Sequence, residues 1–75
     1  MTKSEYDEWK EYLNKSVAKH RVEIKKYSNE ELMDCYERLN YKLNYMLIKD
    51  PLNPFVTWYQ RTVEATGKEI LLRMK

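Results

Sequence analysis

Apolar side chains recur every three or four residues along most of this chain. Over the first third, the repeat passes through Tyr6, Trp9, Leu13, Val17, His20, Ile24 and Tyr27. This spacing keeps one face of an α-helix largely apolar, and Thr2 with Glu5 supplies a capping box at its start. We predict a helix over residues from about 4 to about 26. Residues 21–25 also alternate like a β-strand, which would need a pairing partner in another chain.

The sharpest local signal marks the start of a second helix. Ser28 is its N-cap and Glu31 its third residue, which completes a capping box, and Tyr27 can pack on Leu32 as a hydrophobic staple. Pro51 ends the helix, because the residue before a proline is pushed out of the helical conformation. We predict a helix over residues 29–49. The tight corner before it leads us to expect that the first two helices run antiparallel, side by side.

A third helix follows the second break. Asn53 can act as its N-cap, with Pro54 at the first helical position, and the helix is predicted over residues from about 54 to about 74. Its main apolar stripe consists of Phe55, Tyr59, Val63, Thr66, Ile70 and Met74. Gly67 interrupts this helix at a cost of about 1 kcal/mol relative to Ala. The glycine either marks a close helix crossing or ends the ordered helix, which would leave residues 68–75 as a mobile tail.

Three helices of similar length joined by short corners indicate the fold class. We predict an all-α, antiparallel three-helix bundle, with residues 1–75 forming a single helical domain. The chain contains one Gly and two Pro, too few turn residues for a many-stranded β fold.

The second helix has more apolar faces than a core requires. Its core stripe consists of Leu32, Cys35, Tyr36, Leu39, Leu43, Met46 and Leu47, while Tyr41, Tyr45 and Ile48 lie on the opposite side. Trp58 and Leu72 recur on a second stripe of the third helix. Large aromatic and aliphatic side chains of this kind form interface hot spots. We therefore predict Tyr41, Tyr45, Ile48, Trp58 and Leu72 as protein-binding residues.

Basic residues gather in the second half of the first helix. The net charge is only +2, but residues 13–27 carry Lys15, Lys19, Arg21, Lys25 and Lys26 against a single acid. The helix dipole stabilises cations near a helix C-terminus, which accounts for such a cluster. It is also the pattern that binds phosphates without sequence preference, which makes nucleic-acid binding the alternative function.

The sequence argues against an enzyme with a cofactor or a metal. His20 is the only histidine and Cys35 the only cysteine, whereas metal sites with nitrogen and sulfur ligands need several such residues close together. Gly67 is the only glycine, so no phosphate-binding loop is present. Ser16, His20 and Glu23 could share a helix face, but mid-helix backbone offers no free N–H for an oxyanion hole. We interpret His20 as a partly buried core residue and Cys35 as a small buried hydrophobe.

One cysteine cannot form an intrachain disulfide, which favours a reducing, cytoplasmic location. No apolar run long enough for a membrane helix or a signal peptide occurs. Abundant Lys, Asn and Tyr with scarce Gly are typical of an AT-rich bacterial or phage genome. We predict a small non-enzymatic helical interaction protein that regulates or inhibits a larger protein by binding its surface, working as a homodimer without cofactors or small-molecule substrates.

Overall fold

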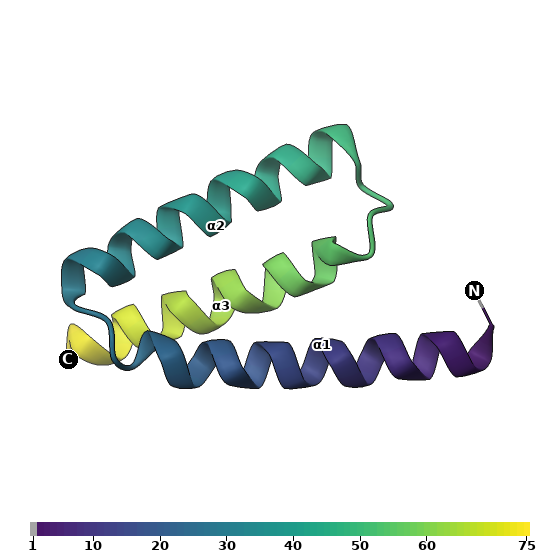
Figure 1. Cartoon of the computed structure of the whole chain (residues 1–75). Coiled ribbons are helices and arrows are strands. Elements are labelled where there is room, and N and C mark those ends of the chain that lie inside the picture. The colour runs from purple at the N-terminus through teal and green to yellow at the C-terminus, as the bar shows by residue number, and fades with distance from the viewer. Residues whose placement is uncertain (1) are drawn as a thin grey trace.

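Three α-helices make up the computed structural model of the chain, which describes residues 2–75. α1 spans Lys3–Ile24, α2 spans Asn29–Lys49 and α3 spans Phe55–Arg73 (Figure 1). The predicted all-α, three-helix fold is confirmed, and the helix ends differ from the predicted ones by at most two residues. No strand occurs between residues 2 and 75: residues 21–24 are the last turn of α1 and Lys25 is its C-cap.

Side chains at each helix start hold the backbone as the sequence indicates. Thr2 caps α1 with its hydroxyl. The Ser28 Oγ accepts from the Glu31 N–H at 3.1 Å, and the Glu31 carboxylate accepts from the Ser28 N–H at 3.0 Å. Before α3, the Asn53 side chain accepts from the Phe55 N–H at 2.8 Å. Each contact satisfies a backbone donor that the helix itself cannot pair.

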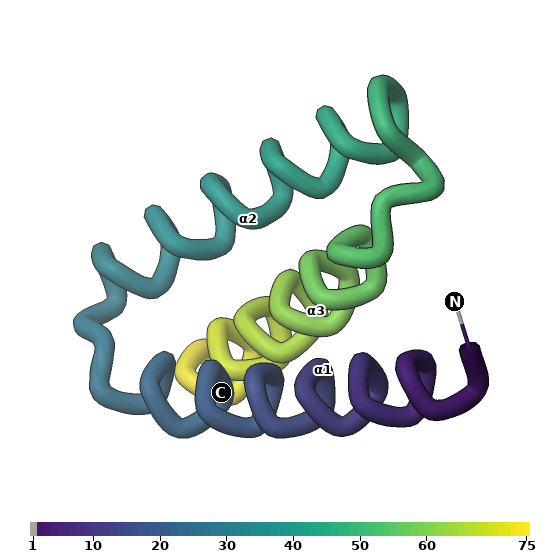
Figure 2. Tube along the Cα trace, turned by 45° about the vertical axis from the view of Figure 1, so that its right-hand side comes forward, coloured from purple at the N-terminus to yellow at the C-terminus, as the bar shows by residue number. Residues whose placement is uncertain are grey.

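The last helix lies between the other two. α3 packs against α2 and against α1, whereas α1 and α2 make little contact with each other. α1 and α3 run in the same direction and α2 runs opposite to both (Figures 1 and 2). The molecule measures 43 × 26 × 16 Å, and a helix with its side chains is already about 10–12 Å wide. The bundle is therefore an open layer. Our prediction that α1 and α2 lie side by side is wrong, because α3 lies between them.

The core follows this arrangement. Its buried apolar side chains are Leu13, Val17, Ile24, Leu32, Met46, Val56 and Ala65. Two threonines of α3, Thr62 and Thr66, are fully buried as well. Their hydroxyls donate to main-chain carbonyls of the same helix, at 3.1 Å to Tyr59 and at 2.7 Å to Thr62. Because the hydroxyls are satisfied within α3, the helix can present threonine to both neighbours without an unpaired polar group.

α2 and α3 approach each other closely at Gly67. A Cβ atom at this position would lie 3.3 Å from Cε2 of Tyr36. The glycine sits inside α3, which continues to Arg73. Gly67 therefore marks a close helix crossing, and residues 68–73 are ordered helix.

Arg73 ties the end of α3 to the corner between α1 and α2. Its guanidinium donates to the carbonyls of Tyr27 at 2.8 Å, Ile24 at 3.2 Å and Lys25 at 3.3 Å. Glu69, one turn earlier, pairs with its Nε at 3.3 Å. The last carbonyls of a helix lack internal partners, so Arg73 acts as a C-terminal cap for α1 supplied by another helix.

Candidate protein-binding surfaces

The open layer leaves more surface uncovered than a compact protein of this size. Surface–mass scaling gives about 5,000 Å² for a monomer of 9.3 kDa. The chain exposes 5867 Å², an excess of about 900 Å². One partner in a standard protein–protein interface contributes about 800 Å². The extra surface is thus of the size that binding a partner would cover.

A groove runs between the first half of α2 and the second half of α3. It consists of two adjoining hollows of about 330 and about 450 Å³, which share Met33 and Ile70. We call it the α2/α3 groove, and its apolar lining is Met33, Tyr36, Val63, Ile70, Leu71 and Met74. The absent side chain of Gly67 adds to its width, since the glycine is also part of the lining.

Three lining side chains are well exposed to solvent. Met33 is 46% exposed, Leu71 61% and Met74 77%. Beside them, Lys68 pairs with Glu64 at 3.3 Å, so the α3 rim carries little net charge. Methionines adapt their shape to different partners and are frequent on promiscuous binding surfaces. The groove therefore combines an adaptable apolar lining with a polar rim.

Sequence reasoning missed this groove because its lining residues were assigned to the core. Tyr36, Val63, Ile70 and Met74 all lie on predicted core stripes. In the structure α3 turns Val56, Thr62 and Ala65 inward together with Thr66 of the predicted stripe. The stripe residues Val63, Ile70 and Met74 lie at the edge of the α2–α3 contact.

The structure brings the predicted tyrosines of α2 together on its outer face. Tyr41 is 75% exposed, Tyr45 50% and Ile48 76%. They follow one another at spacings of four and three residues, and the Lys42 ammonium lies 5.7 Å from the centre of the Tyr45 ring. Leu72, 62% exposed, belongs to α3 and is not part of this face.

Trp58 occupies a different environment from the exposed residues. Its indole N–H donates to the Ser16 hydroxyl at 2.7 Å, and its ring meets Tyr59 edge-on at 4.9 Å. The side chain is half-buried. Trp58 therefore joins α3 to α1.

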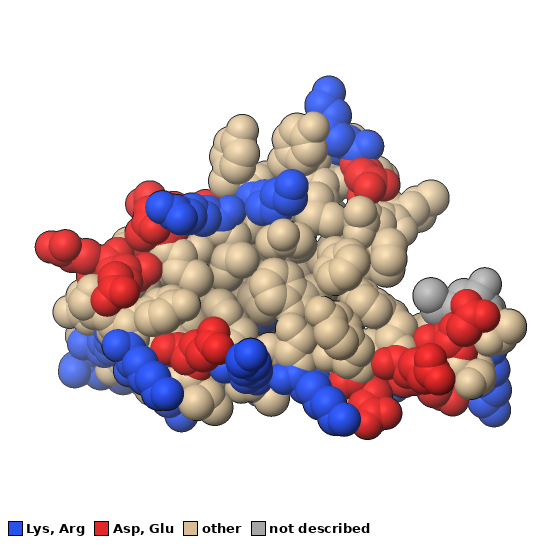
Figure 3. Space-filling model, in the orientation of Figure 1, with Lys and Arg blue, Asp and Glu red and all other residues tan. Residues whose placement is uncertain are grey.

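The five cations in and just after α1 are all exposed but do not form one patch. Lys15 and Lys19 lie on one side of α1 and Arg21 lies on another, while Lys25 and Lys26 follow the last helical residue, Ile24. Lys15 pairs with Glu11 at 2.9 Å. In Figure 3, basic groups along α1 alternate with acidic ones. The charge available to a single phosphate backbone is thus smaller than the sequence suggests.

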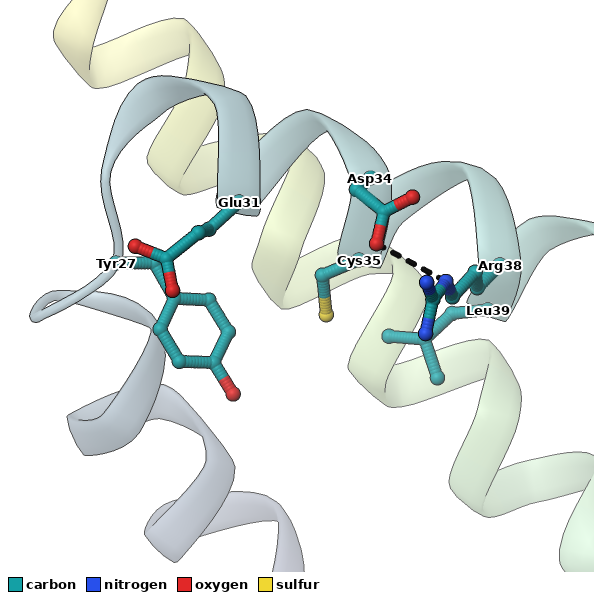
Figure 4. Close-up of a pocket in the computed structure, with 6 residues that line it drawn as sticks. All are labelled: Tyr27, Glu31, Asp34, Cys35, Arg38 and Leu39. Atoms are coloured by element: carbon teal, nitrogen blue, oxygen red, sulfur yellow. Dashed lines mark ion pairs between the residues drawn. The ribbon is translucent and has the colours of Figure 1, made fainter.

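A pocket of about 380 Å³ lies near the corner between α1 and α2 (Figure 4). Its polar residues are engaged: Glu31 belongs to the capping box, and Asp34 pairs with Arg38 at 2.9 Å. The Cys35 thiol faces the interior, and burial, with a smaller contribution from Asp34, raises its pKa. A raised pKa keeps sulfur as the weakly nucleophilic thiol.

His20 connects α1 to the buried threonines. Its Nε2 lies 3.0 Å from the Thr66 hydroxyl. That hydroxyl already donates to Thr62, so it accepts from Nε2–H. Burial lowers the pKa of His20, and Glu23 raises it to a smaller extent. The Ser16 hydroxyl, meanwhile, accepts from Trp58, so the spacing that resembled a catalytic triad serves helix packing.

Residues 2–75 contain neither a membrane-spanning helix nor a metal-binding cluster. No helix there is both long and apolar enough to cross a bilayer. The same residues hold no cluster of three His, Cys, Asp or Glu side chains arranged to bind a metal ion. Comparison of the sequence with protein-family models, with curated proteins and with solved structures finds no match.

Proposed function

We propose that this chain is a small non-enzymatic interaction protein that regulates or inhibits a larger protein by binding it. The α2/α3 groove carries the proposal, because Met33, Leu71 and Met74 are exposed there on two helices that the core holds in place. The uncovered area of the open layer supports it, since it matches one side of a standard interface.

The groove fits one helix of the larger protein. It extends over about two turns of α2, from Asn29 to Tyr36, and about three turns of α3, from Val63 to Met74. Over such a length an amphipathic helix places anchors at i, i+3, i+4 and i+7. Glu30 and Glu37 stand one turn before and one turn after Met33, and both are exposed. Since Glu64 is already paired with Lys68, these two acids set the charge of the rim. The partner helix should therefore carry Lys or Arg beside its apolar stripe.

A pair of synthetic peptides tests this function. Both are amphipathic helices with Leu at the anchor positions, one with Lys and one with Glu at the remaining positions. We expect the Lys peptide to bind the full chain and to shift the backbone amide signals of Met33, Leu71 and Met74 in NMR titrations. Glu30→Gln with Glu37→Gln should weaken its binding about threefold or more, because each exposed ion pair contributes up to about 1 kcal/mol.

Substitutions in the groove give the matched comparison. Leu71→Asp with Met74→Asp should abolish peptide binding and leave the helical circular dichroism unchanged. Val22→Asp, at an equally exposed apolar position on α1, should leave binding intact. Equal binding of the Lys and Glu peptides, or amide shifts confined to α1, would contradict the assignment of the groove.

Nucleic-acid binding through α1 is the alternative function. The exposure of all five cations supports it, and their division between two sides of α1 and the residues after it weakens it. It predicts duplex DNA or RNA binding that falls steeply with salt and with Lys25→Ala and Lys26→Ala. The absence of binding at low salt would remove this alternative.

A further inference from the structure

The outer face of α2 has properties that the α2/α3 groove does not use. Tyr41, Tyr45 and Ile48 form an exposed apolar stripe on α2. Tyr41 and Ile48 are the more exposed, and Tyr45 at the edge also lines a pocket with Phe55 and Tyr59 of α3. Hot-spot residues of this kind, fixed on a capped helix, need little ordering when a partner binds.

Charge is divided along the same face. The first half carries the acids Glu30, Asp34 and Glu37, and the second half carries Lys42 and Lys49. Arg38 lies at the middle of the helix and pairs with Asp34 at 2.9 Å, so the first half keeps a net negative charge. Figure 3 shows this division: acidic groups gather where α2 begins, and basic groups lie over its middle and toward its end. Two such helices packed antiparallel would set the acidic half of each against the basic half of the other, as a two-fold symmetric interface requires.

We propose that the partner of this face is a second copy of the chain, bound through an antiparallel α2–α2 contact. The arrangement is self-complementary in charge, and it places the tyrosine stripes of both copies at the centre.

A specific register follows from the spacing along α2. Asp34, Arg38, Tyr45 and Lys49 share one side of the helix, since their spacings of four, seven and four residues return to it. When Asp34 of one copy faces Lys49 of the other, Arg38 faces Tyr45. The contact thus sets the Asp34–Arg38 pair of each copy against Lys49 and Tyr45 of the other copy around its two-fold axis.

The dimer leaves the groove of each copy free, because the groove lies on the other side of α2, toward α3. A dimer would therefore present two grooves and could bind a bivalent target with a gain in avidity. The two contacts rest on different apolar residues and share only the acids Glu30 and Glu37, which lie between the groove and the outer face of α2.

Charge reversal on the full chain tests the register. Sedimentation equilibrium of the wild type should show reversible dimers with a Kd in the micromolar range, about 1–100 µM. Asp34→Lys alone and Lys49→Glu alone should each weaken dimerisation about tenfold or more, because like charges then face each other. An equimolar mixture of the two variants should restore dimers, since every pair in the mixed dimer is again of opposite sign.

Two controls separate this result from misfolding and from the groove. Glu23→Lys and Lys26→Glu make the same charge changes on α1 and should leave the Kd unchanged. Tyr41→Ala with Tyr45→Ala should give monomers of unchanged helicity that still bind the Lys peptide. A wild type that stays monomeric at about 1 mM, dimers that persist in the tyrosine variant, or a variant mixture that stays monomeric would each overturn the proposal.

Discussion

The guanidinium of Arg73 donates a hydrogen bond of 2.8 Å to the main-chain carbonyl of Tyr27, which precedes α2. The same side chain reaches the carbonyls of Ile24 and Lys25 at the end of α1. One residue of the last helical turn therefore holds the corner formed by the other two helices.

Removing this cap should destabilise the protein. We expect Arg73→Ala to lower the free energy of unfolding by about 2 kcal/mol, because hydrogen bonds from a charged donor to partly buried carbonyls are lost. Lysine at this position, in Arg73→Lys, should keep less than half of the free energy that Arg73→Ala loses, since an ammonium lacks the planar fork that reaches several acceptors. Urea titration measures both. Lys68→Ala, which removes only an exposed ion pair, should change stability by less than about 0.5 kcal/mol; equal losses at residues 68 and 73 would contradict the role of the cap.

Stability should fall as the pH drops below about 6.5, the ordinary pKa of histidine. Burial lowers the pKa of His20 in the folded state, so the unfolded chain takes up a proton more readily in this window. Protonation at Nδ1 therefore favours unfolding. His20 is the only histidine, so the effect can be assigned. Denaturant titrations at pH 5.5 and 7.5 measure the free energy of unfolding, and His20→Gln should remove the difference between the two values. If the His20→Gln variant kept the same pH dependence, another group would be its cause.

The crossing at Gly67 should respond to its neighbour. Replacing a mid-helix glycine with alanine ordinarily stabilises a helix by about 1 kcal/mol. In the wild-type background we expect Gly67→Ala to stabilise the protein by less than this amount, because the new Cβ would lie 3.3 Å from the Tyr36 ring. In a Tyr36→Ala background the full gain should appear. A double-mutant cycle measures the coupling, and purely additive effects would show that the ring moves aside freely.

Cys35 should be protected from alkylation. Burial, the largest cause, raises the pKa of its thiol and reduces the thiolate fraction. We expect iodoacetamide at pH 8 to modify the folded protein about tenfold or more slowly than the same chain in urea, because unfolding returns the thiol to its ordinary pKa. Mass spectrometry over time measures both rates, and equal rates would mean that the thiol is open to solvent in the folded state.

The helices could be predicted from the sequence because their determinants are local. The Ser28–Glu31 capping box involves atoms within one turn, and the end of α2 before Pro51 follows from backbone sterics. The rotation of α3 could not be predicted in the same way. Thr62 lies outside the predicted apolar stripe and is buried although threonine counts as polar, because its hydroxyl donates to the Tyr59 carbonyl of α3. A pattern of hydrophobicity contains no signal for that bond.

The candidate surfaces were predicted in part. Tyr41, Tyr45 and Ile48 lie opposite a clear core stripe, so a helical wheel is enough to bring them together. Trp58 looks equally available on a wheel, but its partner Ser16 lies 42 residues away in the chain. Contacts at that separation depend on which helix lies between the others, and the α2/α3 groove was missed for the same reason.

The central helix of this layer is synthesised after both of the helices that pack on it. While Phe55–Arg73 is still within the ribosome, α1 and α2 have been made but make little contact with each other. The hydrophobic faces of α1 and α2 that turn toward α3 then have nothing to pack on, so assembly must wait until α3 has left the ribosome. The N-terminal-first folding common during synthesis of larger proteins does not apply here. A premature stop before α3 would yield two unassembled helices and no smaller folded unit.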